Sequence, residues 1–418
     1  MSLSLIVGVA DIAWATDLST FQTELDGCNS RKTIDPSESC NITGYNYQYG
    51  KGIERDIHKA RLFYEKSCEQ GNSQGCTNLG HIFAVGNGVP RNAIRAVNLY
   101  EKGCRDGNQL SCTHLGEMYF NGAGLDQNDD KAVALVKTAC DANIPEACDL
   151  LGWFHIEGIG GQINSARGFT QFKQFCNDDH AYSCDSLGLS YANGIGTSVN
   201  IKKAEASFRK GCDADYPDAC NSLGNYYNCV GVNIFDSFTP APQKVKTFYQ
   251  KACDLGSSGG CVNLGIFYIQ KGMEDFVRSK KKNQFLKGMK ILDDACFAGN
   301  GEGCNRLGFI HGGGLVVPQD IALSWVYKEK ACQLEFQKAC VAVGRAYLKG
   351  INGFKKNEIK AVELFDHACH EGAYQGCLEL SDMYREGLGV TKDLKKADRY
   401  YRVACKNPYT LECVDRKN

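Results

Sequence analysis

An excess of charge of either sign is missing from this chain of 418 residues. Its 47 Lys and Arg side chains nearly balance its 48 Asp and Glu side chains. A protein that neutralises many phosphates needs a surplus of basic groups. The composition therefore argues against nucleic acid as a partner.

Long apolar runs are also missing. No segment approaches the eighteen or more apolar residues of a membrane-spanning helix, so we expect no membrane insertion. A short apolar stretch, residues 3–10, precedes the small-x-small sequence Ala-Trp-Ala at 13–15, although Asp11 interrupts it and no Lys or Arg stands before it. This pattern predicts a partial signal peptide over residues 1–15, and hence a secreted or periplasmic protein.

Cysteine, by contrast, is abundant. A cytosolic protein of this size would hold 23 Cys only for metal binding or redox chemistry. Structural zinc sites prefer two cysteines separated by two to four residues, and that spacing is absent from the sequence. We therefore predict disulfides, and a compartment that oxidises them.

Twenty of the cysteines form pairs with seven residues between them. The first five pairs follow one another at 36 residues, then come two steps of 41 and 43, and then steps of 36 or 37. A fixed period in this range indicates a solenoid, here of about eleven helical hairpins. The pairs are Cys68 with Cys76, Cys104 with Cys112, Cys140 with Cys148, Cys176 with Cys184, Cys212 with Cys220, Cys253 with Cys261, Cys296 with Cys304, Cys332 with Cys340, Cys369 with Cys377 and Cys405 with Cys413.

Each repeat carries the signals of two helices of about a dozen residues. A glycine stands four residues after the second Cys, as at Gly80, and an aromatic residue commonly follows three later, so a neighbouring helix can approach closely. A G-x-G sequence such as Gly122 and Gly124 then predicts a left-handed helix end. The second helix has a small residue eight before its Cys and commonly an aromatic residue four before it, as at Ala96 and Tyr100.

The short turn inside each cysteine pair predicts the disulfide geometry. The first Cys closes one helix and the second opens the next, so antiparallel neighbours can bring the two Cβ atoms within bonding reach. By chain entropy, each closed loop contributes about 2.5 kcal/mol of stability.

The repeat pattern L-G-x-x-Y-x-x-G-x-G, followed by K-A and Y-x-K-A-C, resembles the Sel1-like repeat. With the added cysteine pairs, residues 40–413 are similar to the Helicobacter cysteine-rich protein branch of that class. The resemblance implies an all-α, right-handed α/α superhelical solenoid, related to tetratricopeptide repeats, with a disulfide in each hairpin. It also implies secretion and weak β-lactamase activity, while a related mitochondrial intermembrane-space branch acts in respiratory-complex assembly.

The sequence departs from this pattern at three places. Cys40 is in frame, but Lys32 stands where its partner is expected, which leaves Cys28 as the substitute. Cys229 is left over by the same arithmetic, so we predict a free thiol or an intermolecular link there. The loops after Cys220 and Cys261 are five and seven residues longer than in the regular repeats.

The two longer loops, residues 229–242 and 271–285, are candidates for partner binding. They contain Phe235, Phe238 and Phe276, and exposed aromatic side chains on loops often mark interaction sites. The alternative is that these side chains fold back over adjacent helices.

Signals of catalysis are weak. S-x-x-K occurs only at Ser207–Lys210 and Ser279–Lys282, and no K-T-G element accompanies it. The G-x-S-x-G match at 256–260 lies in a cysteine turn between helices, whereas a nucleophile elbow needs a preceding strand. H-E-x-x-H is absent, so no zinc hydrolase is indicated.

The histidines give no clear metal site either. His155 and His311 occupy the aromatic position of repeats that are far apart in the sequence, and substitution within the repeat is the simpler interpretation. His367 and His370 flank Cys369 and are expected at the surface of a helix end.

We interpret the chain as a monomeric binding scaffold without cofactor. Its expected organisation is a signal peptide at 1–15, an N-terminal cap and first repeat at 16–67, a solenoid at 68–413 and a tail at 414–418. The ligand would be a peptide, a glycan fragment or a protein. The alternatives, on resemblance alone, are a weak β-lactam hydrolase with unknown catalytic residues and a mitochondrial assembly factor.

Overall fold

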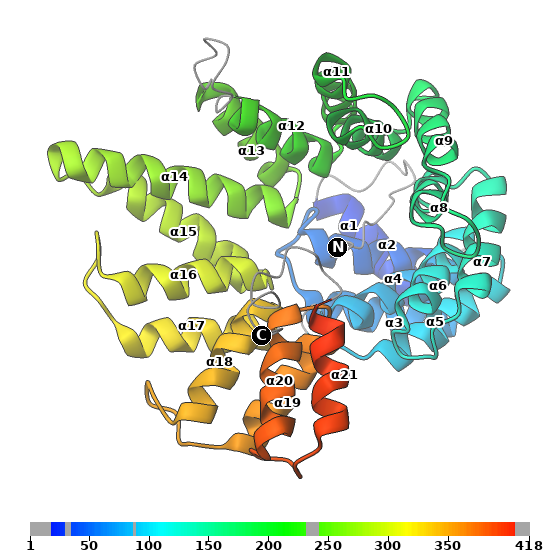
Figure 1. Ribbon diagram of the computed structural model, residues 1–418. Helices are drawn as coiled ribbons and strands as arrows, with labels where there is room; N and C mark the ends of the chain where they lie inside the picture. Colours follow the sequence, from blue (N-terminus) through cyan, green and yellow to red (C-terminus); the bar gives the residue numbers. More distant parts are fainter. Residues whose placement is uncertain (1–17, 30–34, 87–88, 231–241, 406–418) are drawn as a thin grey trace. The chain divides into compact units, whose positions relative to one another are not determined.

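The computed structural model describes residues 18–29, 35–86, 89–230 and 242–405 (Figure 1). These residues form α-helices joined by short turns, and no strand occurs among them. The expected all-helical class is confirmed. Ten pairs of helices follow α1, where the sequence predicted about eleven hairpins.

The helices are, in chain order, α1 (Leu18–Asn29), α2 (Pro36–Tyr49), α3 (Ile57–Glu69), α4 (Ser73–Val85), α5 (Ala93–Arg105), α6 (Gln109–Asn121), α7 (Asp129–Asp141), α8 (Pro145–Glu157), α9 (Ser165–Asn177), α10 (Ala181–Asn193), α11 (Ile201–Asp213), α12 (Pro217–Val230), α13 (Pro242–Asp254), α14 (Ser258–Ser279), α15 (Asn283–Phe297), α16 (Gly301–Gly313), α17 (Ile321–Gln333), α18 (Gln337–Lys349), α19 (Glu358–His370), α20 (Tyr374–Glu386) and α21 (Leu394–Ala404).

The chain divides into two compact units, residues 1–223 and 224–418. In the first unit, consecutive helices pack against one another from the pair α1 and α2 to the pair α10 and α11. In the second unit, they do so from the pair α13 and α14 to the pair α20 and α21. In the first unit the even-numbered helices α2, α4, α6, α8 and α10 also pack against one another in series. They form one continuous layer, as expected of a repeat solenoid.

Specific residues in the sequence determine where the regular helices begin and end. An Asn or Asp side chain caps most odd-numbered helices; Asn92, for example, accepts a hydrogen bond from the backbone N–H of Arg95 at 2.9 Å. Most even-numbered helices end at a glycine in the left-handed region, such as Gly122 with φ of 63°. The second glycine of the loop is also required, because a Cβ on Gly124 would lie 2.5 Å from the carbonyl carbon of Ala93.

Disulfides join each odd-numbered helix to the even-numbered helix that follows it. Their Cα atoms lie 4.4–4.7 Å apart, within the range that disulfides adopt. The bonded pairs are Cys28 with Cys40, Cys68 with Cys76, Cys104 with Cys112, Cys140 with Cys148, Cys176 with Cys184, Cys212 with Cys220, Cys253 with Cys261, Cys296 with Cys304, Cys332 with Cys340 and Cys369 with Cys377.

The second cysteine of these pairs lies in the packed interior of the even-numbered helix. The side chains of Cys76, Cys112, Cys184, Cys304, Cys340 and Cys377 are all buried. These residues therefore hold helices together and are not part of an accessible site. Cys405 is disulfide-bonded as well, while Cys413 and the side chain of Cys229 lie outside the described residues.

In many repeats, a ring-on-glycine contact joins an even-numbered helix to the odd-numbered helix that follows it. The ring of Tyr100 on α5 covers Gly80 on α4 so closely that a Cβ there would lie 2.7 Å from it. Gly188 meets Phe208 in the same way, at 2.5 Å. The recurring spacing predicted close helix approach at this glycine, and the structure shows that a buried ring fills the space.

A second contact recurs at the outer end of these hairpins. The aromatic residue seven positions after the second Cys stacks on the residue five before the next Cys. Ring centroids lie 5.6 Å apart, with nearly parallel planes, in the pairs Tyr47 with Phe63, Tyr227 with Phe248, His311 with Tyr327 and Tyr384 with Tyr400.

The prediction of a long loop after Cys261 is wrong. The extra residues lengthen the helix itself, so α14 runs for 22 residues to Ser279 and only 280–282 separate it from α15. This segment contains no G-x-G sequence to end the helix, and Gly272 allows close approach, since a Cβ there would lie 2.2 Å from the backbone nitrogen of Phe285. The other predicted loop, with Phe235 and Phe238, lies outside the described residues.

None of the helices in the described residues combines the length and the apolar character needed to cross a membrane.

The ring-on-glycine contact predicts a stability loss in Gly80→Val. Tyr100 is fully buried and cannot move aside, so overpacking should lower the free energy of unfolding by about 1–3 kcal/mol. Gly313→Val is the control, because nothing lies within 4 Å of a Cβ at that helical glycine, and it should stay within about 0.5 kcal/mol of the wild type. Urea unfolding followed by circular dichroism measures both, and equal losses would contradict the packing argument.

The cysteine pattern predicts the thiol content. Alkylation of the denatured, unreduced protein, followed by mass spectrometry, should label at most one residue, Cys229, since we expect the remaining 22 of the 23 cysteines to form pairs. Labelling of Cys405 and Cys413 together would show that this last pair does not form.

Candidate functional site

Side chains of the even-numbered helices, most of them polar or aromatic, form a row that we call the even-helix face. It comprises the residues two before, two after and five after the second Cys of each repeat from Cys76 onward. In the first unit these are Gln74, Asn78, His81, Leu110, His114, Glu117, Glu146, Leu150, Trp153, Tyr182, Ser186, Leu189, Asp218 and Ser222. In the second unit they are Asn225, Gly259, Asn263, Ile266, Glu302, Arg306, Phe309, Lys338, Ala342, Arg345, Gln375, Glu379 and Asp382.

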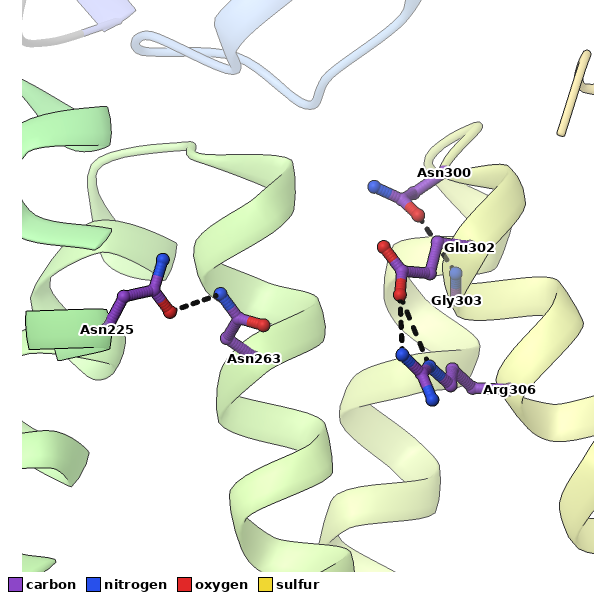
Figure 2. Close-up of polar contacts among 6 residues, drawn as sticks. All are labelled: Asn225, Asn263, Asn300, Glu302, Gly303 and Arg306. Atoms are coloured by element: carbon purple, nitrogen blue, oxygen red, sulfur yellow. Dashed lines mark hydrogen bonds and ion pairs between the residues drawn. The ribbon is translucent and has the colours of Figure 1, made fainter. Parts of the chain in front are cut away.

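Hydrogen bonds between neighbouring even-numbered helices show that these side chains share one face. In the first unit, Asn78 on α4 donates its Nδ2 at 2.9 Å to Oδ1 of Asn41, a buried residue on α2 next to the face. In the second unit, Asn263 on α14 donates to Asn225 on α12 at 3.3 Å, and the two side chains point toward one another in Figure 2. The face is therefore held in place by contacts from repeat to repeat.

On α16 the face carries an exposed ion pair and an exposed ring. Arg306 donates from Nε and Nη2 to Glu302 Oε1 at 3.2 and 2.8 Å. Asn300 caps the same helix by accepting a hydrogen bond from the N–H of Gly303 (Figure 2). Phe309 on the same helix is 62% exposed. This part of the face offers both charge and apolar surface to a partner.

In the first unit, α4 and α6 place two histidines side by side. The ring centroids of His81 and His114 lie 6.4 Å apart, and His114 Nδ1 lies 3.0 Å from Glu117 Oε2. Burial, together with the nearby His114, lowers the pKa of His81 to about 4. His81 is therefore neutral at neutral pH, and its buried Nδ1 has no hydrogen-bond partner among the described residues.

The next helices, α8, α10 and α12, bring four carboxyl groups together, which we call the acidic cluster: Glu146, Asp149, Asp185 and Asp218. Burial raises the pKa of Asp149 and of Asp185 to about 7 each, and hydrogen bonds from serine side chains oppose the shift. The Oδ1 atom of each Asp is buried and has no hydrogen-bond partner among the described residues. Both groups are therefore partly protonated at neutral pH.

Aromatic side chains surround the acidic cluster. Trp153 donates Nε1 to Ser186 Oγ at 3.1 Å, and Ser186 donates its hydroxyl to Asp149 Oδ2 at 2.9 Å. The rings of Tyr182 and Tyr216 lie 4.5 Å apart, and burial followed by the neighbouring carboxyl groups raises the pKa of both hydroxyls. The arrangement is acidic, aromatic and rigid.

The serines singled out by sequence motifs do not form a catalytic group. Ser207 is 8% exposed within α11, where it belongs to the packed interior. Ser257 caps α14 by accepting the N–H of Gly260 at 3.0 Å, and Ser258 is the first residue of that helix, so no strand precedes the G-x-S-x-G match in this described segment. Ser279 is the last residue of α14.

The other singled-out residues also have local roles. His311 stacks on Tyr327, and His155 hydrogen-bonds Gln171. Phe276 is half-buried in α14, and the Nζ atoms of Lys280 and Lys282 lie 5.1 and 5.6 Å from its ring centroid. Among the residues described, no group of three His, Cys, Asp or Glu side chains could hold a metal ion.

Sequence reasoning missed the acidic cluster. A usable signal was the position directly after the second Cys, where other repeats place residues such as Thr77, Val262 or Leu378 and two consecutive repeats place Asp149 and Asp185. A carboxyl group at a core position of the repeat is unusual, because its burial carries a cost.

Comparison with known families settles the class of the protein. The Sel1 repeat model matches residues 37–72, 73–108, 109–144, 181–216, 217–257, 301–336, 337–372 and 375–409, more than half of the chain. The chain belongs to the Sel1 repeat family.

Two cytochrome c oxidase assembly factors are similar in sequence to part of this Sel1 repeat protein. Cytochrome c oxidase assembly factor 7A of Xenopus laevis is 32% identical over 99 residues, and cytochrome c oxidase assembly factor 7 of Xenopus tropicalis is 31% identical over 99 residues. The aligned part is 23% of this chain and 43% of each relative, so the chain spans less than half of their length.

Solved structures of similar fold include bacterial Sel1 repeat proteins. A protective antigen of uropathogenic Escherichia coli aligns over 95% of this chain and 85% of its own, with 21% identity and a TM-score of 0.43. A Sel1 repeat protein of Oxalobacter formigenes aligns over 56% of this chain and 96% of its own, with 20% identity and a TM-score of 0.44.

The raised pKa of Asp149 predicts a pH-dependent stability. Near pH 4 and below, the Asp149 carboxyl group is protonated in both the folded and the unfolded protein. Between about pH 4 and 7 it ionises only in the unfolded chain. The free energy of unfolding therefore falls as the pH rises through this window. Asp149→Asn keeps the shape without the charge. It should raise the thermal midpoint relative to the wild type at about pH 8 and leave it little changed at about pH 4.

The matched control is Asp126→Asn, which alters an exposed aspartate in a loop of the same unit. It should leave the pH profile of the melting temperature unchanged. A profile for Asp149→Asn that runs parallel to the wild type would contradict the assignment of a buried, protonated carboxyl group.

Proposed function

We propose that this Sel1 repeat protein is a protein-binding scaffold of an oxidising compartment, with the even-helix face as its contact surface. The observation that carries the proposal is the row of amide, carboxyl and aromatic groups, many of them half-exposed, that successive even-numbered helices present in register. Such a row matches the spaced hydrogen-bonding groups and side chains of an extended peptide segment.

The rigidity of the face supports this use. Disulfides tie an even-numbered helix to the helix before it, and in many repeats the ring-on-glycine contact ties it to the helix after it, so the spacing of the row is set before a partner arrives. A preorganised surface loses less conformational entropy on binding than a flexible one, which favours affinity.

The acidic cluster in the first unit favours a cationic peptide segment as the partner. The groups that shift the pKa values of Asp149, Asp185 and Tyr182 are carboxyl, hydroxyl and indole groups, so the surroundings are acidic or neutral. A Lys or Arg side chain near Glu146 and Tyr182 would gain both charge complementarity and contact with aromatic rings.

The disulfides favour a compartment that oxidises cysteine. Export through the apolar segment at 3–10 is our leading assignment, and the similarity to the Helicobacter cysteine-rich branch supports it. The mitochondrial intermembrane space is the alternative, supported by the local identity to cytochrome c oxidase assembly factors 7 and 7A. A β-lactam hydrolase rests on resemblance alone, and no side-chain group observed in the described residues favours it.

The proposal predicts loss of peptide binding in even-helix face variants. Peptides selected from a random phage library on the oxidised full chain should be rich in Lys and Arg. Trp153→Ala and the double variant Glu146→Gln with Tyr182→Phe should weaken their binding at least about tenfold, by about 1.4 kcal/mol, and added salt should weaken the wild type in the same direction.

Thr138→Ala and Lys202→Ala are the controls, since both residues are exposed on odd-numbered helices. They should leave the affinity unchanged. Selected peptides whose binding responds to the controls and not to the face variants would exclude the even-helix face as the contact surface.

A further inference from the structure

A pocket of about 890 Å³ opens between α7, α8 and α9 in the first unit. We call it the outer pocket, because the odd-numbered helices α7 and α9 line it rather than the even-helix face. Its volume falls within the range of small-molecule sites. It lies in the one repeat, residues 145–180, that the family match passes over in the first unit between 37 and 216.

Three replacements of regular repeat residues create this space. His155 stands at the aromatic position and Gln171 at the position five before the Cys, where other repeats form a stacked pair such as Tyr47 with Phe63. Gln174 stands two before Cys176, where Lys102 and Lys210 reach back to the Cys carbonyl of the previous repeat. Groups that close the surface in other repeats are thus replaced in this one.

The two polar residues are oriented by hydrogen bonds. Gln171 donates Nε2 to the carbonyl of Cys148 at 2.9 Å, so its Oε1 faces His155 Nδ1 at 3.2 Å and accepts the proton there. The Nε2 atom of His155 then carries the lone pair and can accept a hydrogen bond from a ligand. Burial, followed by the charge of Arg167, lowers the pKa of His155 below its ordinary value, which keeps the ring neutral.

Two cationic side chains and one acidic side chain line the pocket. Arg167 and Lys137 line it, and within the described part of the chain neither forms an ion pair with a carboxylate. Asp141 is the one acidic residue among the described lining side chains. Leu151, Phe154 and Phe175 contribute apolar surface to the pocket wall.

We propose that the outer pocket binds a small organic carboxylate with an apolar body and a neighbouring N–H donor. The carboxylate lies on Arg167 and Lys137, the apolar body contacts Phe154 and Phe175, and the N–H donates to His155 Nε2. The same chemistry occurs in a free acylated amino acid and in the C-terminal residue of a protein tail. The site is separate from the peptide-binding face and does not depend on the function proposed for it.

Isothermal titration of the full oxidised chain with N-acetyl-L-phenylalanine tests the proposal at low salt. This probe has the carboxylate, the ring and the N–H, and N-acetyl-L-phenylalanine amide is the matched probe without charge. We expect saturable binding of the acid and at least about tenfold weaker binding of the amide. A longer peptide that ends in phenylalanine distinguishes a protein tail from a free acylated amino acid. Tighter binding of the peptide than of the free acid indicates a protein tail. No binding of the peptide indicates a free metabolite.

Variants locate the binding site. Arg167→Gln should weaken binding of the acid at least about tenfold, and Lys173→Gln, on the same helix outside the pocket, should leave it within about twofold. The triple variant His155→Tyr, Gln171→Leu and Gln174→Lys restores the regular repeat residues and should abolish binding without loss of helicity.

Absence of saturable binding up to about 10 mM of the acid would overturn the proposal. Binding that survives unchanged in Arg167→Gln or in the folded triple variant would overturn it as well. Loss of binding in the triple variant counts in its favour only when circular dichroism and the thiol content match the wild type.

Discussion

The arrangement of the helices depends on a buried ring that covers a glycine. Tyr100 on Gly80, Phe208 on Gly188 and Phe365 on Gly344 repeat the same contact, and in each a Cβ would come within 2.7 Å of ring atoms. Because the glycine has no side chain, the ring lies directly on the neighbouring helix and fills the space between the two. The distance between the two helices is therefore set by one aromatic ring.

The disulfides complement this contact on the other side of each helix. They join an odd-numbered helix to the following even-numbered one, whereas the ring joins an even-numbered helix to the following odd-numbered one. In the repeats that have both contacts, a helix is thus tied to both of its neighbours by short-range constraints. The even-helix face inherits its spacing from these ties, which explains how polar side chains on different repeats meet at hydrogen-bonding distance.

The proposed binding sites lie where individual repeats depart from the pattern. Asp149 and Asp185 replace the uncharged residues of other repeats and bring carboxyl groups into a packed interface. His155 and Gln171 replace a stacked pair and leave an open pocket. The scaffold tolerates both departures because the contact of Gly152 with Phe172 and the disulfide of Cys140 with Cys148 are retained in the same repeat.

The sequence by itself determined the helical class, the repeat period, the described disulfide partners and the ends of the regular helices, because each depends on residues close together in the chain. It could not determine that the extra residues after Cys261 extend α14, since a segment without proline and without a G-x-G sequence fits a loop or a helix until packing decides. Only the tertiary structure brought Asp149 beside Ser186, and Arg167 beside His155, across or within repeats. Burial and the orientation of hydrogen bonds set the chemistry of these groups, and both are properties of the packed chain rather than of the spacing of its residues.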